Sequence, residues 1–82
     1  MTKTIFTEAN RLIVGRLREE RERSGLHQED LAHLVKRHQS WVSRLENLQY
    51  RLDLVEFCQI CRALKIDPVD LFSDLVKILP EE

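Results

Sequence analysis

The sequence is poor in residues that break or turn a chain. Its 82 residues include two glycines and two prolines, which leaves little room for β-hairpins or long loops. No apolar run approaches the roughly 20 residues of a membrane-spanning helix, so we expect no membrane partner. Residues 1–6 lack the apolar core and cleavage site of a signal peptide, so we expect the cytoplasm as the location.

Cysteine is also scarce, and its two copies form a single C-x-x-C spacing, Cys58 and Cys61. Zinc would need two further ligands, and both thiols fall on the apolar face of an expected helix. We therefore expect buried structural thiols and no metal. The sequence has no nucleophile–base pair, Gly-rich phosphate loop or paired carboxylates, so we predict no enzyme, no cofactor and no small-molecule ligand.

Charge is distributed unevenly, although the formal net charge is only −1. Residues 1–51 hold ten Lys and Arg against seven Asp and Glu, whereas residues 52–82 hold three against seven. Against the single acid Glu46, the stretch 36–51 has Lys36, Arg37, Arg44 and Arg51. A local basic patch of this kind suits a phosphate backbone. The positive electrostatic field of one chain is modest, so we expect weak non-specific binding by one chain and useful affinity only from a dimer.

Apolar periodicity predicts five helices and no strands. They are expected at about 8–23, 28–35, 39–47, 54–64 and 68–79. End signals support these bounds: Thr7, Asp53 with Glu56, and Asp67 before Pro68 at helix starts, and Gly25 at a helix end. The expected fold is all-α, a compact five-helix bundle in which residues 1–82 form one domain.

The fifth helix has more apolar positions than one buried stripe needs. Three are expected to close the core: Leu71, Phe72 and Leu75. Three more are expected to pack across the two-fold axis of a homodimer: Val76, Ile78 and Leu79.

The helices at 28–35 and 39–47 are joined by only three residues, a spacing typical of a helix-turn-helix motif. Apolar residues hold the two helices together: Leu31, Ala32, Val35, Val42 and Leu45. At about 100° per residue, the other side of the second helix carries amide, hydroxyl and guanidinium groups. A helix-turn-helix presents this side to the DNA major groove.

Residue chemistry divides the expected DNA contacts into two sets. Base contacts are assigned to Gln39, Ser40, Ser43 and Arg44, since Gln pairs with adenine and Arg with guanine. Backbone contacts are assigned to Gln28, Lys36, Arg37, His38, Asn47 and Arg51. The alternative is a merely soluble face, but such a face would carry Glu and Lys. Trp41 is left open between packing over the preceding helix and lying against sugar–phosphate or a thymine methyl.

Four stretches resemble the Cro and phage-repressor (XRE-type) family of helix-turn-helix regulators, in that family's order and spacing. They are residues 25–32, 39–46, 51–57 and 63–72, within a resemblance that covers about 12–75. The resemblance implies a lambda-repressor-like fold in a bacterial or phage protein. It also implies that Gln28 holds a phosphate, that Gln39, Ser40 and Arg44 read bases, and that Asn47 contacts the backbone. The residue matching Glu46 pairs in this family with a first-helix Arg, here Arg21.

Three positions depart from the family pattern. Lys36 and Leu48 stand where the family usually has glycine, after each helix of the motif. If the backbone keeps a positive φ at Lys36, that residue bears roughly 1 kcal/mol of strain; otherwise the loop differs and the second helix moves. Leu34 replaces a usually polar residue, which places it at an expected interface.

The function predicted from these features is sequence-specific binding of double-stranded DNA by a homodimeric transcriptional regulator with a palindromic operator. The alternative is a protein-interaction module of the same fold, antitoxin-like or in contact with RNA polymerase through the acidic residues of 67–82. The same acidic stretch could recruit RNA polymerase to a DNA-bound dimer. Metal or redox sensing through Cys58 and Cys61 is a third, weaker hypothesis.

Overall fold

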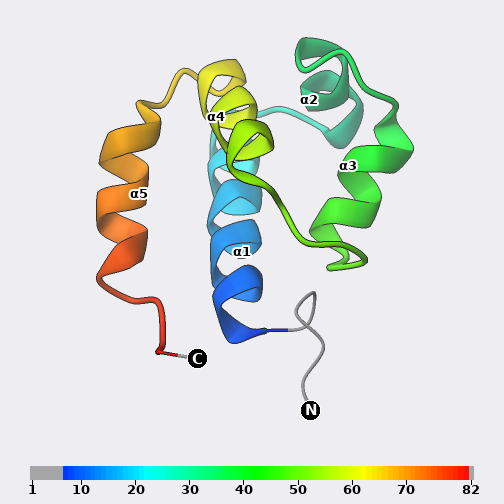
Figure 1. Ribbon diagram of the computed structural model, residues 1–82. Helices are drawn as coiled ribbons and strands as arrows, with labels where there is room; N and C mark the ends of the chain where they lie inside the picture. Colours follow the sequence, from blue (N-terminus) through cyan, green and yellow to red (C-terminus); the bar gives the residue numbers. More distant parts are fainter. Residues whose placement is uncertain (1–6, 82) are drawn as a thin grey trace.

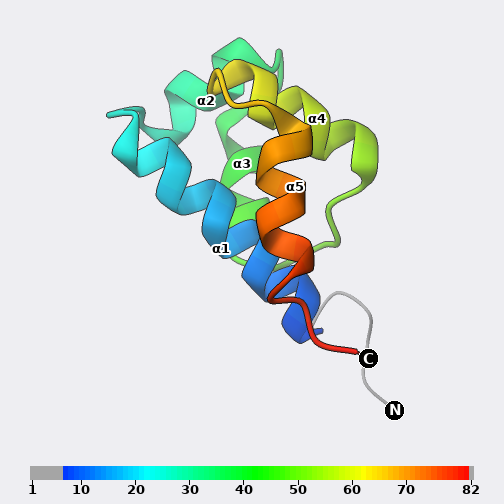
Figure 2. The same cartoon turned by 90° about the vertical axis from the view of Figure 1, so that its left-hand side faces the viewer.

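The computed structural model describes residues 7–81, which form five helices and no strand. They are α1 (Glu8–Arg23), α2 (Gln28–Leu34), α3 (Gln39–Glu46), α4 (Leu54–Ala63) and α5 (Pro68–Val76). In Figure 1, α2 and α3 lie on one side of α1 and α4, and α5 lies on the other. Figure 2 shows α5 running along the outside of α1 and α4. The expected all-α fold is confirmed.

Side-chain caps define the helix starts. The Thr7 hydroxyl accepts a hydrogen bond from the Asn10 N–H at 3.2 Å, and Asp67 accepts from the Val69 N–H at 2.8 Å. Asp53 and Glu56 form a reciprocal capping box at α4, as their spacing predicts. At α2, where His27 is a poor cap, the Asp30 carboxylate accepts from the His27 N–H at 2.8 Å.

Four helices end with the same backbone turn. The residue that follows each C-cap, two positions after the last helical residue, has a positive φ: Gly25 (77°), Lys36 (59°), Leu48 (61°) and Lys65 (60°). The next N–H then donates to a carbonyl five residues back, as from Arg37 to Ala32 at 2.9 Å and from Gln49 to Arg44 at 2.9 Å. This is the Schellman pattern, which satisfies carbonyls that a helix end leaves unpaired.

One buried apolar cluster draws on all five helices. Its members are Val14, Leu17, Leu31, Ala32, Val42, Leu45, Phe57, Ile60, Cys61, Leu64, Leu71 and Leu75. Four of the five residues expected to hold α2 and α3 together belong to this cluster. The fifth, Val35, is partly buried at its edge. Burial raises the pKa of the Cys61 thiol to about 11, which keeps it neutral at physiological pH.

The prediction for α5 is wrong in two respects. Phe72 does not close the core; it is 43% exposed and meets Phe57 edge to face, because Leu71 and Leu75 already fill the space one turn apart. The helix also ends at Val76, three residues before the expected end at Leu79. Beyond Val76 the chain makes one closing turn, in which the Ile78 and Leu79 N–H groups both donate to the Leu75 carbonyl at 3.0 Å. Pro80 has no N–H to continue the helix after this turn. Val76 and Ile78 are exposed and Leu79 is partly buried.

The other helix ends lie within one residue of expectation. No helix within residues 7–81 is long and apolar enough to cross a bilayer. The same part of the chain holds no group of three metal-ligating side chains.

Candidate nucleic-acid interface

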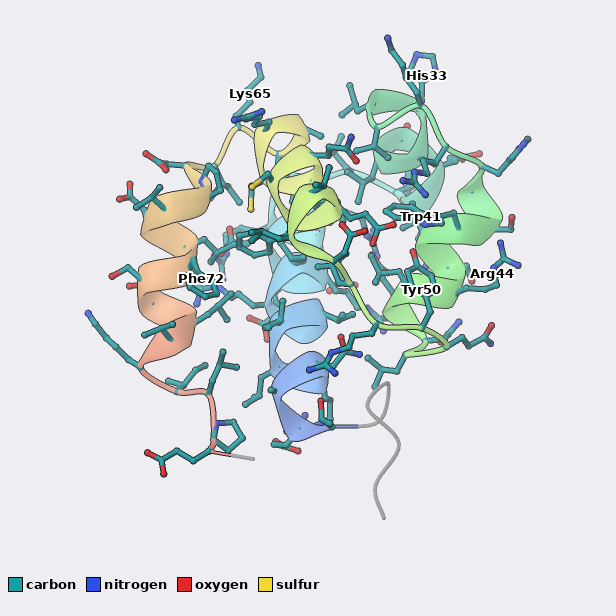
Figure 3. The ribbon with its side chains drawn as sticks, in the orientation of Figure 1. His33, Trp41, Arg44, Tyr50, Lys65 and Phe72 are labelled. Atoms are coloured by element: carbon teal, nitrogen blue, oxygen red, sulfur yellow. The ribbon has the colours of Figure 1, made fainter. Side chains whose placement is uncertain are left out.

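The second helix of the motif, α3, buries one side and exposes the other. Val42 and Leu45 lie in the core, whereas Gln39, Ser40, Arg44 and Asn47 are exposed. Arg44 points away from the body of the molecule (Figure 3), and no acidic group of residues 7–81 lies within ion-pair distance of it. Its guanidinium is therefore available to a base edge or a phosphate.

Ser43 is less exposed than its place on the helix predicts. It is partly buried, and its hydroxyl accepts a 3.4 Å hydrogen bond from Asn47 Nδ2. The two residues share one turn of α3, so a ligand on this face would meet them together.

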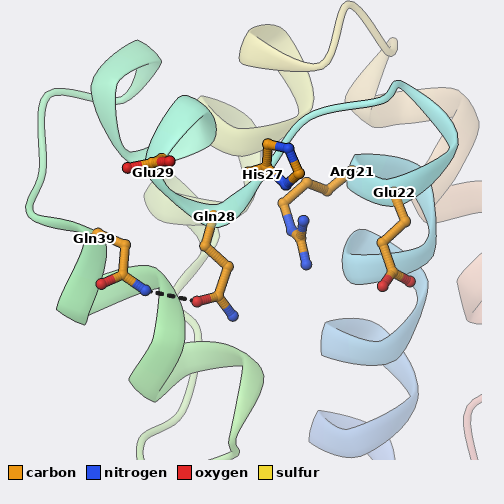
Figure 4. A pocket seen from close by; sticks show the side chains of 6 residues that line it. All are labelled: Arg21, Glu22, His27, Gln28, Glu29 and Gln39. Carbon is orange, nitrogen blue, oxygen red and sulfur yellow. Dashed lines mark hydrogen bonds between the residues drawn. The ribbon is translucent and has the colours of Figure 1, made fainter.

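A line of hydrogen bonds runs from the interior to the start of α3. Arg21 Nε and Nη2 donate to the Glu46 carboxylate at 2.7 Å and 2.9 Å, and Glu46 Oε1 also accepts from Gln28 Nε2 at 3.0 Å. Gln28 Oε1 in turn accepts from Gln39 Nε2 at 2.7 Å (Figure 4). The structure thus contains the Arg21–Glu46 pair that the resemblance implied, and it joins that pair to two expected DNA contacts.

The Arg21–Glu46 pair is a buried anchor. The two side chains are only 8% and 5% exposed, and Arg21 Nη1 also donates to the Leu26 carbonyl at 2.7 Å. Hydrogen bonding to Glu46 raises the pKa of Arg21. Because the pair is enclosed and fully bonded, it fixes the orientation of α3 on α1 and gives Gln28 a fixed partner.

Gln28 and Gln39 face an open pocket of about 640 Å³, lined by Arg21, Glu22, His27, Gln28, Glu29 and Gln39 (Figure 4). Within residues 7–81, the Oε1 of Gln39 has no protein partner. Its amide therefore presents an oxygen and a remaining N–H, the pair of groups that matches adenine in the major groove.

The turn between α2 and α3 keeps the left-handed backbone of the family's glycine, now on a lysine. Lys36 has a φ of 59°. The loop therefore keeps the family's backbone conformation, and Lys36 bears the strain expected for a residue with a side chain. Lys36, Arg37 and His38 are exposed, and His38 precedes the first turn of α3 as its N-cap residue. Leu48 has the same conformation after α3, and Arg51 is exposed a few residues further on.

Trp41 belongs to a side-chain cluster that the sequence pattern does not predict. The Arg37 guanidinium carbon lies 4.4 Å from the Trp41 ring centroid, and the Tyr50 ring centroid lies 6.0 Å from it. Burial is the largest cause that raises the pKa of the Tyr50 hydroxyl. Trp41 therefore packs on the turn, on the segment after α3 and against the edge of the core. The sequence signal for this cluster is two aromatic residues nine positions apart, Trp41 and Tyr50.

Comparisons with known proteins agree with this geometry. Residues 12–72 match the helix-turn-helix domain family. An XRE-family like protein from Pseudomonas syringae pv. tomato str. DC3000 is 38% identical, with 88% of each chain covered and a TM-score of 0.81. The restriction-modification controller protein C.AhdI from Aeromonas hydrophila is 40% identical over 73% of this chain and 87% of its own, with a TM-score of 0.66.

A third similar structure shows a likeness of fold alone. The wild-type restriction-modification controller protein C.Esp1396I is 22% identical, with 87% of this chain and 92% of its own covered and a TM-score of 0.79. A comparison with curated proteins found no match. The expected lambda-repressor-like arrangement of the five helices is thus shared with solved XRE-family structures.

Proposed function

This chain belongs to the helix-turn-helix domain family of DNA-binding transcriptional regulators, and we propose that it reads a specific double-stranded sequence through α3. It is a regulator and not an enzyme. The single observation that carries the proposal is the exposed side of α3, where Gln39, Ser40 and Arg44 stand without an acidic neighbour on the same helix face. We propose base contacts for these three residues and for Ser43.

Backbone contacts are proposed for residues that flank this reading face on both sides. Gln28 and His38 stand at the starts of α2 and α3, and Asn47 and Arg51 follow α3. Lys36 adds a flexible positive charge beside them. Contacts to phosphates on either side of the groove would set the register of α3 without carrying sequence information.

We propose that the binding unit is a homodimer, and that α4 and α5 supply its interface. An apolar groove of about 530 Å³ lies between these helices, lined by Leu54, Phe57, Cys58, Arg62, Pro68, Val69, Phe72, Ser73 and Val76. Ile78, two residues beyond the groove-lining Val76, is also an exposed apolar residue. A second copy is the favoured occupant, since one chain has too modest a positive charge for tight DNA binding.

A homodimer of this kind implies a palindromic operator. Two recognition helices related by a two-fold axis require inverted half-sites about one helical turn apart. Because its partner is genomic DNA, we propose the bacterial cytoplasm as the place of action.

A gel-shift experiment separates this function from a protein-interaction module. Labelled genomic duplexes are incubated with the protein in excess polyanion over a range of salt concentrations. Sequence-specific binding predicts a shifted duplex that survives the competitor and depends on its sequence. If no sequence preference appears at any salt concentration, the interaction module is favoured, and the exposed acids Asp67, Asp70 and Asp74 become its candidate surface for RNA polymerase or another partner.

A further inference from the structure

We propose that Arg37 is a positioning residue for DNA reading, clamped between Trp41 and Glu56, rather than the phosphate contact that its place in the basic patch predicts. The inference rests on the proposed DNA-binding function. It assigns a role to three residues, Arg37, Trp41 and Glu56, that the line of bonds from Arg21 to Gln39 does not include.

Arg37 touches three different elements at once. Its backbone N–H donates to the Ala32 carbonyl of α2 at 2.9 Å. Its guanidinium stacks over Trp41 of α3 at 4.4 Å, and Nη2 lies 3.6 Å from Glu56 Oε2 of α4. A planar guanidinium suits this double task, because it stacks through its face and donates through its edge.

Both partners of Arg37 are themselves fixed. Glu56 Oε1 accepts from the Asp53 N–H at 3.0 Å, and the Glu56 N–H donates to Asp53 Oδ1 at 2.7 Å, so the N-terminal cap of α4 holds the carboxylate. The side chain of Glu56 is only 13% exposed, against 37% for Arg37. Trp41 is held by the Tyr50 ring and by a 3.5 Å hydrogen bond from the Tyr50 hydroxyl to its carbonyl.

The clamp lies where the recognition helix has the least other support. The main packing of α3 is on α2, with a smaller contact to α1, and Trp41 and Tyr50 lie on the side of α3 toward α4 (Figure 3). Arg37 therefore joins the turn, α3 and the start of α4. The strained backbone at Lys36 immediately precedes it, so the clamp also holds the turn that sets the angle of α3.

A phosphate contact would have to break this arrangement. To reach DNA, Arg37 would leave both the Trp41 ring and the Glu56 carboxylate. Glu56 would then act as a competitor of the phosphate. The two roles therefore predict opposite effects of removing the negative charge at Glu56.

The test measures the dissociation constant of an operator duplex against salt concentration for wild type, Arg37→Ala, Arg37→Lys and Glu56→Gln. The clamp predicts operator binding weakened roughly 3- to 30-fold in all three variants, with the salt slope unchanged. A lysine fails as a substitute because it keeps the charge but lacks the planar stack. Glu29→Gln is the charge-matched control for Glu56→Gln. It removes an exposed acid beside Gln28 and shows how much the loss of one negative charge by itself changes the dissociation constant.

A phosphate contact predicts a different pattern. Arg37→Ala would lower the salt slope by about 0.9, Arg37→Lys would bind as wild type, and Glu56→Gln would bind more tightly than Glu29→Gln. That pattern overturns the clamp, as does operator binding unchanged in Arg37→Ala. A wild-type protein without any sequence preference overturns the proposed function and this inference together.

A readout without DNA guards against misfolded variants. Trp41 is the chain's single tryptophan, and Arg37 covers part of its ring. Arg37→Ala should increase acrylamide quenching of Trp41 fluorescence while circular dichroism stays that of wild type. Unchanged quenching in a folded variant would show that Arg37 does not stack on Trp41 in solution, and would overturn the clamp.

Discussion

Gln39 Nε2 donates a 2.7 Å hydrogen bond to Gln28 Oε1, which ties the first residue of α3 to the first residue of α2. Gln28 is itself held by Glu46, and Glu46 by Arg21. An exposed amide at the proposed DNA surface is thus positioned by a buried ion pair. The same line of contacts makes the fold and the reading face depend on one another.

Breaking the buried pair should be strongly destabilising. Arg21→Ala leaves the Glu46 carboxylate enclosed without its main partner, with a hydrogen bond from Gln28 and with Arg18 Nε 4.0 Å away. We expect the free energy of unfolding to fall by about 3 kcal/mol, the lower end of the range for broken buried pairs. Urea denaturation followed by circular dichroism measures it. Arg11→Ala, which breaks the exposed Arg11–Glu8 pair of the same helix, should leave the midpoint nearly unchanged. Equal effects of the two substitutions would contradict the anchoring role of Arg21.

Arg44 and Arg51 should differ in the kind of binding they support. Arg44→Ala should weaken operator binding by about 1–3 kcal/mol and relax the preference at one base pair. Arg51→Ala should weaken binding to all duplexes alike and lower the salt slope by about 0.9. Fluorescence anisotropy on operator and scrambled duplexes, at several salt concentrations, separates these outcomes. An Arg44→Ala protein that keeps full affinity and sequence preference would exclude Arg44 from base reading.

The positive-φ helix ends predict changes of opposite sign at two positions. Gly25→Ala should lower the free energy of unfolding by about 1–2 kcal/mol, because an alanine is strained in left-handed backbone. The added Cβ would meet nothing within 4 Å, so no packing contact offsets that strain. Lys65→Gly should stabilise by less than about 1 kcal/mol, since relief of strain is partly offset by a more flexible unfolded chain. Thermal melts measure both. Lys65→Ala, which keeps the strain, is the control and should show no gain.

The apolar surface of α4 and α5 predicts a dimer that a single charge disrupts. Val76 lines the groove and is 54% exposed, so Val76→Glu should leave the chain folded and shift the mass in solution to the 9.8 kDa monomer. Val55→Glu is matched in chemistry and 66% exposed, but Val55 lies outside the groove, so this variant should stay dimeric. Light scattering after gel filtration reads both, and a monomeric wild type would remove the basis for a palindromic operator.

Local chemistry made the helices predictable, whereas tertiary packing decided the exceptions. Asp53 with Glu56, and Asp67 with Pro68, define their helix starts from sequence alone because each cap acts within one turn. The exposure of Phe72 is not predictable from the sequence, because the sequence does not show how many apolar residues one core accommodates. The sequence places Arg37 in a basic patch and does not predict its contacts to Trp41 and Glu56, because these depend on how the turn folds back on α4.

Selection of bound sites from a random duplex library tests the central claim most directly. If α3 reads DNA in a dimer, the enriched sequences should contain two inverted half-sites whose centres are about 10–10.5 base pairs apart. The Arg44→Ala protein should lose the preference at one symmetric pair of positions within them. A library that shows no enrichment, with wild-type protein folded and at low salt, would contradict sequence-specific reading by this chain.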